Sequence, residues 1–501
     1  MRDTNMQPDT AHFLNVARCL DRGQGLSNPA AWPAWLRPAR LPMPDTWKEP
    51  GYPWLIATLA RAGIEPFRAG QAISLVAGLL LPLVVWLLAR QVAADPRVAW
   101  LAALMVAGSP ELVDKSVSAL SESLFTLLVT LTFLCAAWRL RDDPRRRTWR
   151  ADALAGALFG ACCLVRSQAA LALPALAVLM LWGRPWRRSL AVGVVAAVAA
   201  LLVLSPFIAR NLRLFGVPFH SDAPASAMWA YGDPIMLSHG LDRPSGFAGF
   251  AVRHPLDVLT HFLRGAWYFA KSVLPFGLLG NPLWLLTAVL GLDAVRRSWR
   301  AGLFAVLYIG LTVGLVLSIS WEGRYFASTV PAWCLLAAVG ATRAARALDG
   351  RWAAGARAGR PVPPLAAAAV LALAAIGPLV AVLRQPARVF PPHPEIAAAR
   401  EYAPWLQARL APDEAVMVMT TSYWAWFVDR PVVHLVIADS TDFLEEVRRL
   451  KVRWAVLPTE ALPPRIARYP DRRLPRALVV EGRDPVLGVT RYRVEPAGAA
   501  R

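Results

Sequence analysis

Uncharged apolar runs long enough to cross a lipid bilayer recur along most of this chain and limit the folds open to it. A helix crosses the hydrocarbon layer with roughly 20 apolar residues, and about 17 can suffice. Runs of this length lie at 70–89, 167–183, 189–209, 272–292, 302–321, 325–342 and 361–383, a further run at 116–138 is interrupted only by Glu122, and shorter runs lie at 98–110 and 153–165. The sequence therefore predicts an all-α polytopic membrane domain of about ten transmembrane helices.

The composition agrees with a membrane protein, and the positive charges indicate its topology. Of the 501 residues, 56% are hydrophobic and 18% are charged, with a net charge of +20, whereas soluble domains have about 45–50% apolar and about 25% charged residues. Arginine clusters lie at 139–150, 184–188, 296–300 and 343–360. These are short loops next to apolar runs, where Lys and Arg mark the cytoplasmic side. The charge therefore indicates orientation, and nucleic acid is not an expected partner.

Placing the arginine clusters in the cytoplasm determines the expected side of the remaining segments. An outer loop then lies at about 210–264, and because the crossings begin and end on one face, residues 1–66 also lie outside. No apolar signal sequence precedes this segment, so we expect that a first transmembrane helix is missing before it. The expected domains are an extracytoplasmic catalytic loop with amphipathic helices at 1–66, a membrane domain at 67–384 and an extracytoplasmic domain at 385–501.

One of the apolar runs contains residues that interrupt a helix. Pro275, Asn281 and Pro282 lie within 272–292, and a proline removes a backbone donor and obstructs the preceding turn. We therefore expect the first half of this run to be broken or to lie at the membrane interface.

The C-terminal segment alternates between short helical and short extended patterns. Residues 395–410 and 443–452 have helical spacing, whereas 414–421, 432–438 and 453–458 have the composition of strands. This pattern predicts a small α/β domain.

The cysteines indicate neither a disulfide framework nor a zinc site. They are Cys19, Cys135, Cys162, Cys163 and Cys334, with no CxxC pair and no histidine-rich metal spacing. Most lie in or beside apolar runs, where a thiol behaves as a small hydrophobic group.

Two polar stretches near the N-terminus carry candidate catalytic residues. In the stretch PDTAHFLNVARCL, Asp9 stands at or just before the start of a predicted amphipathic helix. An aspartate there commonly caps the helix and favours the positive end of its dipole, and this role is compatible with catalysis. In the stretch DTWKEPGYPWL, Lys48 and Glu49 precede a turn, and the simplest interpretation is an interfacial helix anchored by aromatic residues.

Further charged residues lie at the outer ends of the predicted membrane helices: Glu122, Arg166, Arg210 and Arg324. Charge inside or at the edge of a membrane span is costly and by default indicates function. Arg210 can instead extend to the interface, whereas Glu122 and Arg166 have apolar sequence on both sides. Acidic and basic groups gathered on one face suit a phosphate-bearing lipid substrate and an acid–base reaction.

The order of these motifs resembles the GT-C fold glycosyltransferases, a group that includes dolichyl-phosphate-mannose protein mannosyltransferases, the bacterial lipid A aminoarabinose transferase and the Rgt-type lipopolysaccharide transferases. The matching features are Asp9, Phe13 and Ala17–Arg18, then Gly23 and Gly25, the KEPGYP turn at 48–53, LSESLF at 120–125, Arg166 before LALP, the exit motif at 206–218, and the pair Arg324–Tyr325. No single piece is specific, but the ordered set covers roughly residues 7–345. Members usually have a transmembrane helix before the acidic residue and often a second acid beside it, where this chain has Pro8.

The resemblance implies an inverting transfer of a sugar from a polyprenyl-phosphate carrier to a lipid, glycan or protein acceptor. It further implies a bacterial inner-membrane protein with its catalytic face in the periplasm. It assigns Asp9 as the general base, a role worth typically 10²–10⁴-fold, and it assigns phosphate binding to Lys48, Arg166, Arg210 and Arg324, with Tyr325 beside them. Glu122 is expected to orient one of these cations. Some relatives use a divalent cation, but no ligand set in this sequence demands one, so no cofactor is assigned.

Two other functions are compatible with a membrane protein of this composition. A transporter or flippase also places charges inside the membrane, along its substrate path. Against it, the charges here lie at outer helix ends, and the sequence shows no internal repeat. The second is a relative of the same fold that binds lipid without catalysis. Loss of sugar transfer in Asp9→Asn, with intact binding of the lipid carrier, supports the enzyme over these alternatives.

Overall fold

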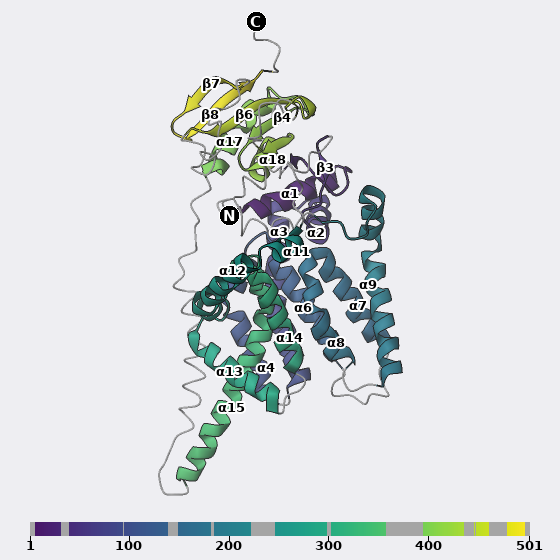
Figure 1. The fold of residues 1–501 in the computed structure, drawn as a ribbon, viewed down its shortest axis with the longest axis vertical. Helices are drawn as coiled ribbons and strands as arrows, with labels where there is room; N and C mark the ends of the chain where they lie inside the picture. Colours follow the sequence, from purple (N-terminus) through teal and green to yellow (C-terminus); the bar gives the residue numbers. More distant parts are fainter. Residues whose placement is uncertain are drawn as a thin grey trace.

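The computed structural model describes the chain except for residues 1–5, 32–39, 94, 139–148, 182–184, 222–245, 298–301, 357–393, 435–444, 446, 460–477 and 496–501. The described residues form a bundle of helices with a mixed α/β domain at one end (Figure 1). This arrangement confirms the predicted fold class, an all-α membrane domain with a small α/β domain near the C-terminus.

The first part of the chain forms the helices α1 (Pro8–Asp21), α2 (Gly51–Arg61), α3 (Pro66–Val92), α4 (Pro96–Ala107), α5 (Pro110–Ser116) and α6 (Glu122–Ala137). Proline in the first turn and an acidic N-cap define two of these starts. The Glu65 side chain accepts hydrogen bonds from the amides of Phe67 and Arg68 at the start of α3. The Asp95 side chain accepts one from the amide of Arg97 at the start of α4.

The next helices continue the bundle and complete its described part. They are α7 (Trp149–Val165), η4 (Ser167–Ala172), α8 (Leu173–Leu181), α9 (Trp186–Phe215), α11 (Gly246–Arg253), α12 (Pro255–Tyr268), η6 (Phe269–Leu278), α13 (Pro282–Arg297), α14 (Leu303–Leu317), η8 (Gly323–Thr329) and α15 (Val330–Ala356). Each apolar run within the described ranges forms mainly helix, as predicted. The run at 361–383 lies outside the described ranges. Of the outer loop at 210–264, residues 222–245 also lie outside them, and much of the rest forms the short helices α11 and α12.

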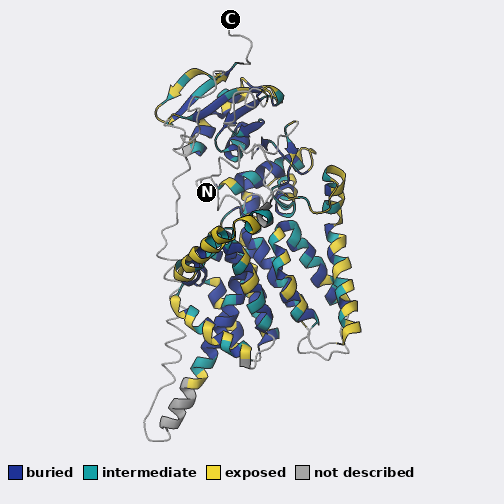
Figure 2. Ribbon diagram, in the orientation of Figure 1, coloured by how far each residue is buried: buried dark blue, intermediate teal, exposed yellow. Residues whose placement is uncertain are grey.

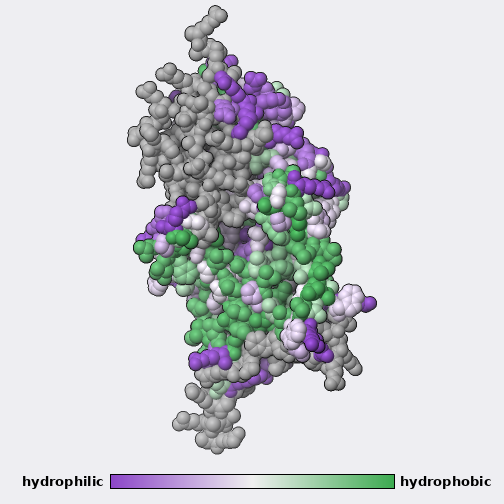
Figure 3. Space-filling model, turned by 45° about the vertical axis from the view of Figure 1, so that its right-hand side comes forward, coloured by the Kyte–Doolittle hydropathy of each residue, from purple (hydrophilic) through white to green (hydrophobic). Residues whose placement is uncertain are grey.

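Several of these helices are candidates for membrane spans. Within the described ranges, Pro66–Val92, Trp186–Phe215 and Gly323–Ala347 are long and apolar enough to cross a bilayer. A fourth candidate is the pair Pro255–Leu278 and Pro282–Arg296, which is bent by 106° at its break. The break lies where the sequence predicted one. On the face drawn in Figure 3, hydrophobic surface covers much of the helical region and hydrophilic residues lie toward both ends, as expected of a multi-pass membrane protein.

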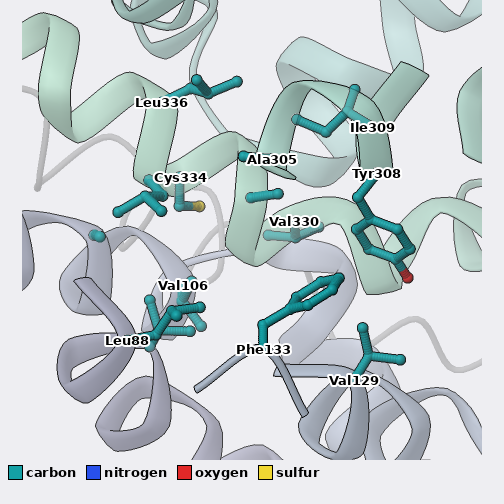
Figure 4. Close-up of a cluster of buried hydrophobic side chains, with 14 of the residues drawn as sticks. Leu88, Val106, Val129, Phe133, Ala305, Tyr308, Ile309, Val330, Cys334 and Leu336 are labelled. Atoms are coloured by element: carbon teal, nitrogen blue, oxygen red, sulfur yellow. The ribbon is translucent and has the colours of Figure 1, made fainter. Parts of the chain in front are cut away.

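Apolar side chains fill the interior of the bundle, where α3, α4 and α6 meet α14 and α15 (Figure 4). The Phe133 ring of α6 contacts the rings of Phe304 and Tyr308 edge-on, with centroids 5.3 and 5.2 Å apart. By contrast, many side chains on α9 and α12 are exposed (Figure 2). In α12, Leu256 and Trp267 are 75% and 70% exposed, which suits contact with lipid.

The α/β domain contains a six-stranded sheet in the order β2-β5-β4-β6-β8-β7. The strands are β2 (Ala30–Ala31), β4 (Ala415–Val418), β5 (Val432–His434), β6 (Val452–Pro458), β7 (Leu478–Asp484) and β8 (Val489–Val494). β2, β5, β4 and β6 are parallel, whereas β8 pairs antiparallel with β6 and β7. The structure has strands within each of the predicted ranges 414–421, 432–438 and 453–458, but the first is shorter than predicted: β4 ends at Val418, and a helix, α18 (Thr421–Val428), begins at Thr421. The helix predicted at 395–410 corresponds to α17 (Pro394–Gln407).

Strand β2 comes from the other end of the chain, which the sequence pattern did not indicate. Ala30 and Ala31 pair in parallel register with Val432 and Val433 of β5. The N-terminal segment therefore contributes an edge strand to the C-terminal sheet. A second short sheet within this segment pairs β1 (Ser27–Asn28) with β3 (Met43–Pro44). The domain boundaries at 66 and 384 stay predictions.

Candidate active site

Helix α1 carries Asp9 in its first turn, at the junction of the bundle and the α/β domain (Figure 1). The helix begins at Pro8, with Gln7 as its N-cap, because proline is well suited to the first helical position. Asp9 is therefore inside the helix rather than at or before its cap. The capping interpretation is wrong, and the Asp9 carboxylate forms ion pairs instead.

The Asp9 carboxylate lies between two cations that come from distant parts of the chain. Its Oδ1 is 2.8 Å from Nζ of Lys48, and its Oδ2 accepts a hydrogen bond from Nη1 of Arg324 at 2.7 Å. The three side chains are 25%, 19% and 17% exposed. Burial raises the pKa of the Asp9 carboxyl, but the charges of Lys48 and Arg324 outweigh it and hold the pKa well below its ordinary value.

The turn before α2 positions Lys48. The Lys48 amide donates to Oδ2 of Asp45 at 3.4 Å, and Oε1 of Glu49 accepts a hydrogen bond from the Ser167 amide at 2.8 Å. These contacts hold the turn against Asp45 on one side and against the start of η4 on the other. Burial lowers the pKa of the Lys48 ammonium, but the charge of Asp9 outweighs it and raises the pKa above its ordinary value. Lys48 therefore stays charged.

Arg324 lies near the start of η8 and has several acceptors. Besides Asp9, its guanidinium donates to Oε2 of Glu322 at 2.6 Å and to the Tyr325 hydroxyl at 3.1 Å. Gln168 of η4 donates to the Tyr325 carbonyl at 2.9 Å, which ties this turn to the neighbouring helix. A planar guanidinium serves such a divided set of acceptors better than a lysine ammonium does.

A second ion pair, between Arg166 and Glu122, lies next to the Tyr325 ring. Nη1 of Arg166 is 2.9 Å from Oε1 of Glu122, whose side chain is only 4% exposed. The Arg166 and Arg324 guanidiniums are 5.5 and 4.9 Å from the centroid of the Tyr325 ring. The ring thus links the two ion pairs into one cluster. The other Glu122 oxygen, Oε2, accepts no hydrogen bond within the described ranges.

Arg210 has contacts of a different kind from the other predicted cations. Its Nη2 donates to the backbone carbonyls of Leu26 and Asp45, each at 2.9 Å, and its Nη1 donates to Oδ1 of Asn211 at 2.9 Å. The two bonds to backbone carbonyls attach the end of α9 to the residues that precede β1 and follow β3. Its predicted contact with phosphate stays a prediction, since no ion pair connects it to the cluster around Asp9 among the residues the structure describes.

Sequence reasoning missed a buried polar group next to the predicted site. The Asp45 side chain is 2% exposed, and its two oxygens lie 3.0 and 3.2 Å from Nε2 of His12. Nδ2 of Asn28 is 3.1 Å from the same His12 nitrogen. His12 follows Asp9 by one helical turn and Asp45 precedes Lys48 by three residues, so proximity to the predicted residues was the available signal.

The described side chains do not offer a site for a resident metal ion. No group of three or more His, Cys, Asp or Glu residues gathers in the described ranges with a spacing that would hold one. Both Asp9 oxygens are already paired with cations. The cationic side chains of Lys48, Arg166 and Arg324 make this cluster better suited to an anionic ligand than to a metal ion.

Two comparisons relate the sequence to known proteins. Residues 45–209 match the family described as dolichyl-phosphate-mannose-protein mannosyltransferase. An undecaprenyl phosphate-alpha-4-amino-4-deoxy-L-arabinose arabinosyl transferase of Pseudomonas aeruginosa is 34% identical over 163 residues, which are 31% of this chain and 29% of that protein. The same enzyme of Pseudomonas paraeruginosa matches to the same extent. The matched region thus spans less than a third of these curated relatives.

Solved structures resemble the chain over nearly its whole length. ArnT from Cupriavidus metallidurans, bound to undecaprenyl phosphate, has a TM-score of 0.55 at 15% identity and covers 97% of this chain and 93% of its own. The oligosaccharyltransferase AglB from Archaeoglobus fulgidus, in complex with an inhibitory peptide and a dolichol-phosphate, has a TM-score of 0.59 at 14% identity, covering 90% and 65%. At these identities the likeness shows a shared fold.

Proposed function

From the GT-C fold that this chain shares with those structures, we propose that it is an inverting glycosyltransferase of a bacterial inner membrane. It moves a sugar from a polyprenyl-phosphate carrier to a lipid, glycan or protein acceptor outside the cytoplasm. The observation that most supports this function is the placement of the Asp9 carboxylate between Lys48 and Arg324. A base and two phosphate-binding cations are the groups that such a transfer needs.

The proposed active face is periplasmic. Helix α1, which carries Asp9, and the α/β domain lie toward one end of the bundle, and the basic C-terminal part of α15 extends from the opposite end (Figure 1). Because short basic segments mark the cytoplasmic side, this arrangement supports placing residues 1–66 and 385–501 outside.

Donor binding activates the base in the proposed mechanism. Without a ligand, Lys48 and Arg324 hold the pKa of Asp9 low, and a carboxylate with such a low pKa is a poor proton acceptor. The donor phosphate competes with Asp9 for both cations. When they turn to the phosphate, Asp9 loses its ion pairs and its pKa rises toward the ordinary value.

The transfer itself then balances as a single displacement at the anomeric carbon. The acceptor oxygen or nitrogen attacks this carbon from the face opposite the phosphate, and its proton passes to Asp9. The bond between the carbon and the phosphate oxygen breaks, and its electron pair stays on the leaving polyprenyl phosphate. Lys48 and Arg324 stabilise the additional negative charge, which is greatest in the transition state and product.

The second ion pair supports this set of cations. Glu122 holds Arg166 through a 2.9 Å contact, and Arg166 faces the same Tyr325 ring as Arg324. Arg166 therefore stands ready to bind the phosphate together with Arg324, with Glu122 as its orienting partner. Both guanidiniums lie within cation–π range of the Tyr325 ring, which favours their placement there.

Mass spectrometry of envelope glycolipids and glycoproteins tests the function in a deletion strain. We expect one sugar modification to disappear and to return with the wild-type gene but not with Asp9→Asn. Purified Asp9→Asn should still bind undecaprenyl phosphate. If Asp9→Asn restores the modification fully, Asp9 is not the base. If the modification persists in the deletion strain while a lipid-linked or anionic substrate accumulates on one side of the membrane, the chain is a transporter.

A further inference from the structure

Helix α1 has the active site on one side and the α/β domain on the other (Figure 1). Asp9 precedes Arg18 by nine positions, and at about 100° per residue the two side chains point to opposite sides of the helix. Asp9 faces Lys48 and Arg324, whereas Arg18 faces α18 (Thr421–Val428). The C-terminal domain thus contacts the back of the helix that carries the proposed base.

Asp429, the residue that ends α18, is the centre of this contact. Its Oδ1 accepts hydrogen bonds from Nη1 of Arg18 and Nη1 of Arg22, each at 2.9 Å, and its Oδ2 accepts one from Nη2 of Arg22 at 2.7 Å. Burial raises the pKa of the Asp429 carboxyl, but hydrogen bonding from Arg22 and the charge of Arg18 outweigh it and lower the pKa. The carboxylate is therefore charged at neutral pH.

Further bonds hold α1 against α18 along its length. Nη2 of Arg18 donates to the Trp426 carbonyl at 2.9 Å, and its guanidinium stacks 3.9 Å from the centroid of the Trp426 ring. Asn15 donates to the Ser422 carbonyl at 2.9 Å. At the other end, the Tyr423 hydroxyl donates to the Met6 carbonyl at 3.2 Å. These contacts resist both rotation and sliding of α1.

The backbone conformation at position 429 does not by itself require an aspartate, so the carboxylate is the reason for this residue. Its φ is 53°, in the left-handed region that glycine adopts without strain and that Asp and Asn adopt more easily than other residues. Glycine would therefore satisfy the backbone here. Only the acidic side chain can pair with Arg18 and Arg22.

We propose that Asp429 is a positioning residue for the transfer reaction, through which the C-terminal domain sets the direction of Asp9. A carboxylate about 5–6 Å from a helix axis moves by about 1 Å for each 10° of helix rotation. A misplacement of that size costs about 10²-fold in rate. This inference rests on the proposed function, because it assumes that Asp9 takes part in the chemistry.

Two variants test the role of Asp429, and a third serves as the control. Asp429→Asn keeps the shape and tolerates the backbone conformation but removes the charge, and Asp429→Gly also relieves the backbone. The control is Asp413→Asn, which removes an exposed ion pair with Lys451 in the same domain. This ion pair does not involve α1. Purified protein is mixed with membranes of the deletion strain, and product is followed by mass spectrometry while lipid-linked donor extract from wild-type cells is titrated.

We expect Asp429→Asn and Asp429→Gly to lower kcat by about 10–100-fold with KM for the donor extract within about twofold. Both Asp429 variants should bind undecaprenyl phosphate with the affinity of the wild type. The control Asp413→Asn should have wild-type kinetics. Wild-type kcat in both Asp429 variants overturns the inference, as does a fall in activity that follows only the amount of folded protein. Asp9→Asn is measured alongside: full activity there refutes the proposed base, whereas its inactivity together with active Asp429 variants refutes the positioning role alone.

Discussion

Replacing Asp9 with Asn should tighten the binding of undecaprenyl phosphate while abolishing transfer. In the unliganded protein both Asp9 oxygens are paired, one with Lys48 at 2.8 Å and the other with Arg324 at 2.7 Å. A phosphate must displace these contacts before it can use the same cations. Asparagine has nearly the same shape but no charge, so both cations become available to the ligand.

The size of the effect follows from the exposure of the pairs. The three side chains are 17–25% exposed, which places each pair between an exposed ion pair of about 0.2–1 kcal/mol and a hydrogen bond to a charged group of about 1.5–3 kcal/mol. Taking about 1 kcal/mol for each pair, relief of the competition amounts to about 2 kcal/mol. Because about 1.4 kcal/mol is a factor of ten in affinity, the dissociation constant should fall by about 10–30-fold.

Binding is measured with purified protein in nanodiscs, titrated with undecaprenyl phosphate at several salt concentrations. Without lipid, Asp9→Asn should have a lower melting temperature than the wild type, because two partly buried cations lose their partner. Saturating undecaprenyl phosphate should restore it, since a ligand that binds the folded state stabilises it. Weaker or unchanged binding by Asp9→Asn refutes the proposed competition, provided that Asp413→Asn binds like the wild type.

Three further predictions concern the same site and the bundle around it. Arg324→Lys keeps the charge but cannot serve all of its acceptors at once, so undecaprenyl phosphate should bind about tenfold more weakly; an unchanged titration would argue against a role for the guanidinium geometry. Because Lys48 and Arg324 outweigh burial and lower the pKa of Asp9, the free enzyme should keep this carboxylate charged as the pH falls, and the acid limb of kcat/KM should lie below the ordinary Asp pKa of about 3.9. An acid limb of kcat/KM between about pH 5 and pH 7 would contradict this expectation. Gly156→Ala should lower the melting temperature and the yield of folded protein, because a Cβ there would lie 2.0 Å from the Ala196 carbonyl oxygen of α9. Gly193→Ala, which meets nothing within 4 Å, should be neutral or stabilising by up to about 1 kcal/mol.

Local patterns predicted the helical elements well because they depend on short-range periodicity. The uncharged runs within the described ranges form mainly helix, and the run with Pro275 and Pro282 is bent by 106° at its break. The start of α1 was displaced by a residue or two, since Pro8 rather than Asp9 opens it. That small difference matters, because it turns Asp9 from a cap into a side chain whose carboxylate is available to Lys48 and Arg324.

Of the candidate site, the sequence supplied the residue types but not their pairing. The sequence predicts site roles for Asp9, Lys48, Glu122, Arg166, Arg324 and Tyr325, and the structure gathers these residues into one cluster. The same pattern predicts a site role for Arg210, yet its guanidinium donates hydrogen bonds to backbone carbonyls. An arginine at a helix end has the same local pattern in either case.

The sequence by itself determined that this chain is a polytopic helical membrane protein with an appended α/β domain. Bilayer thickness requires long apolar runs, and those runs are visible residue by residue. Only the tertiary structure decided which charges meet, because Asp9 and Arg324 are 315 positions apart and no periodicity extends that far. It also decided that Ala30 and Ala31 join the C-terminal sheet and that Asp429 holds the back of α1. Such contacts depend on how whole helices pack, and local sequence does not encode that packing in any single segment.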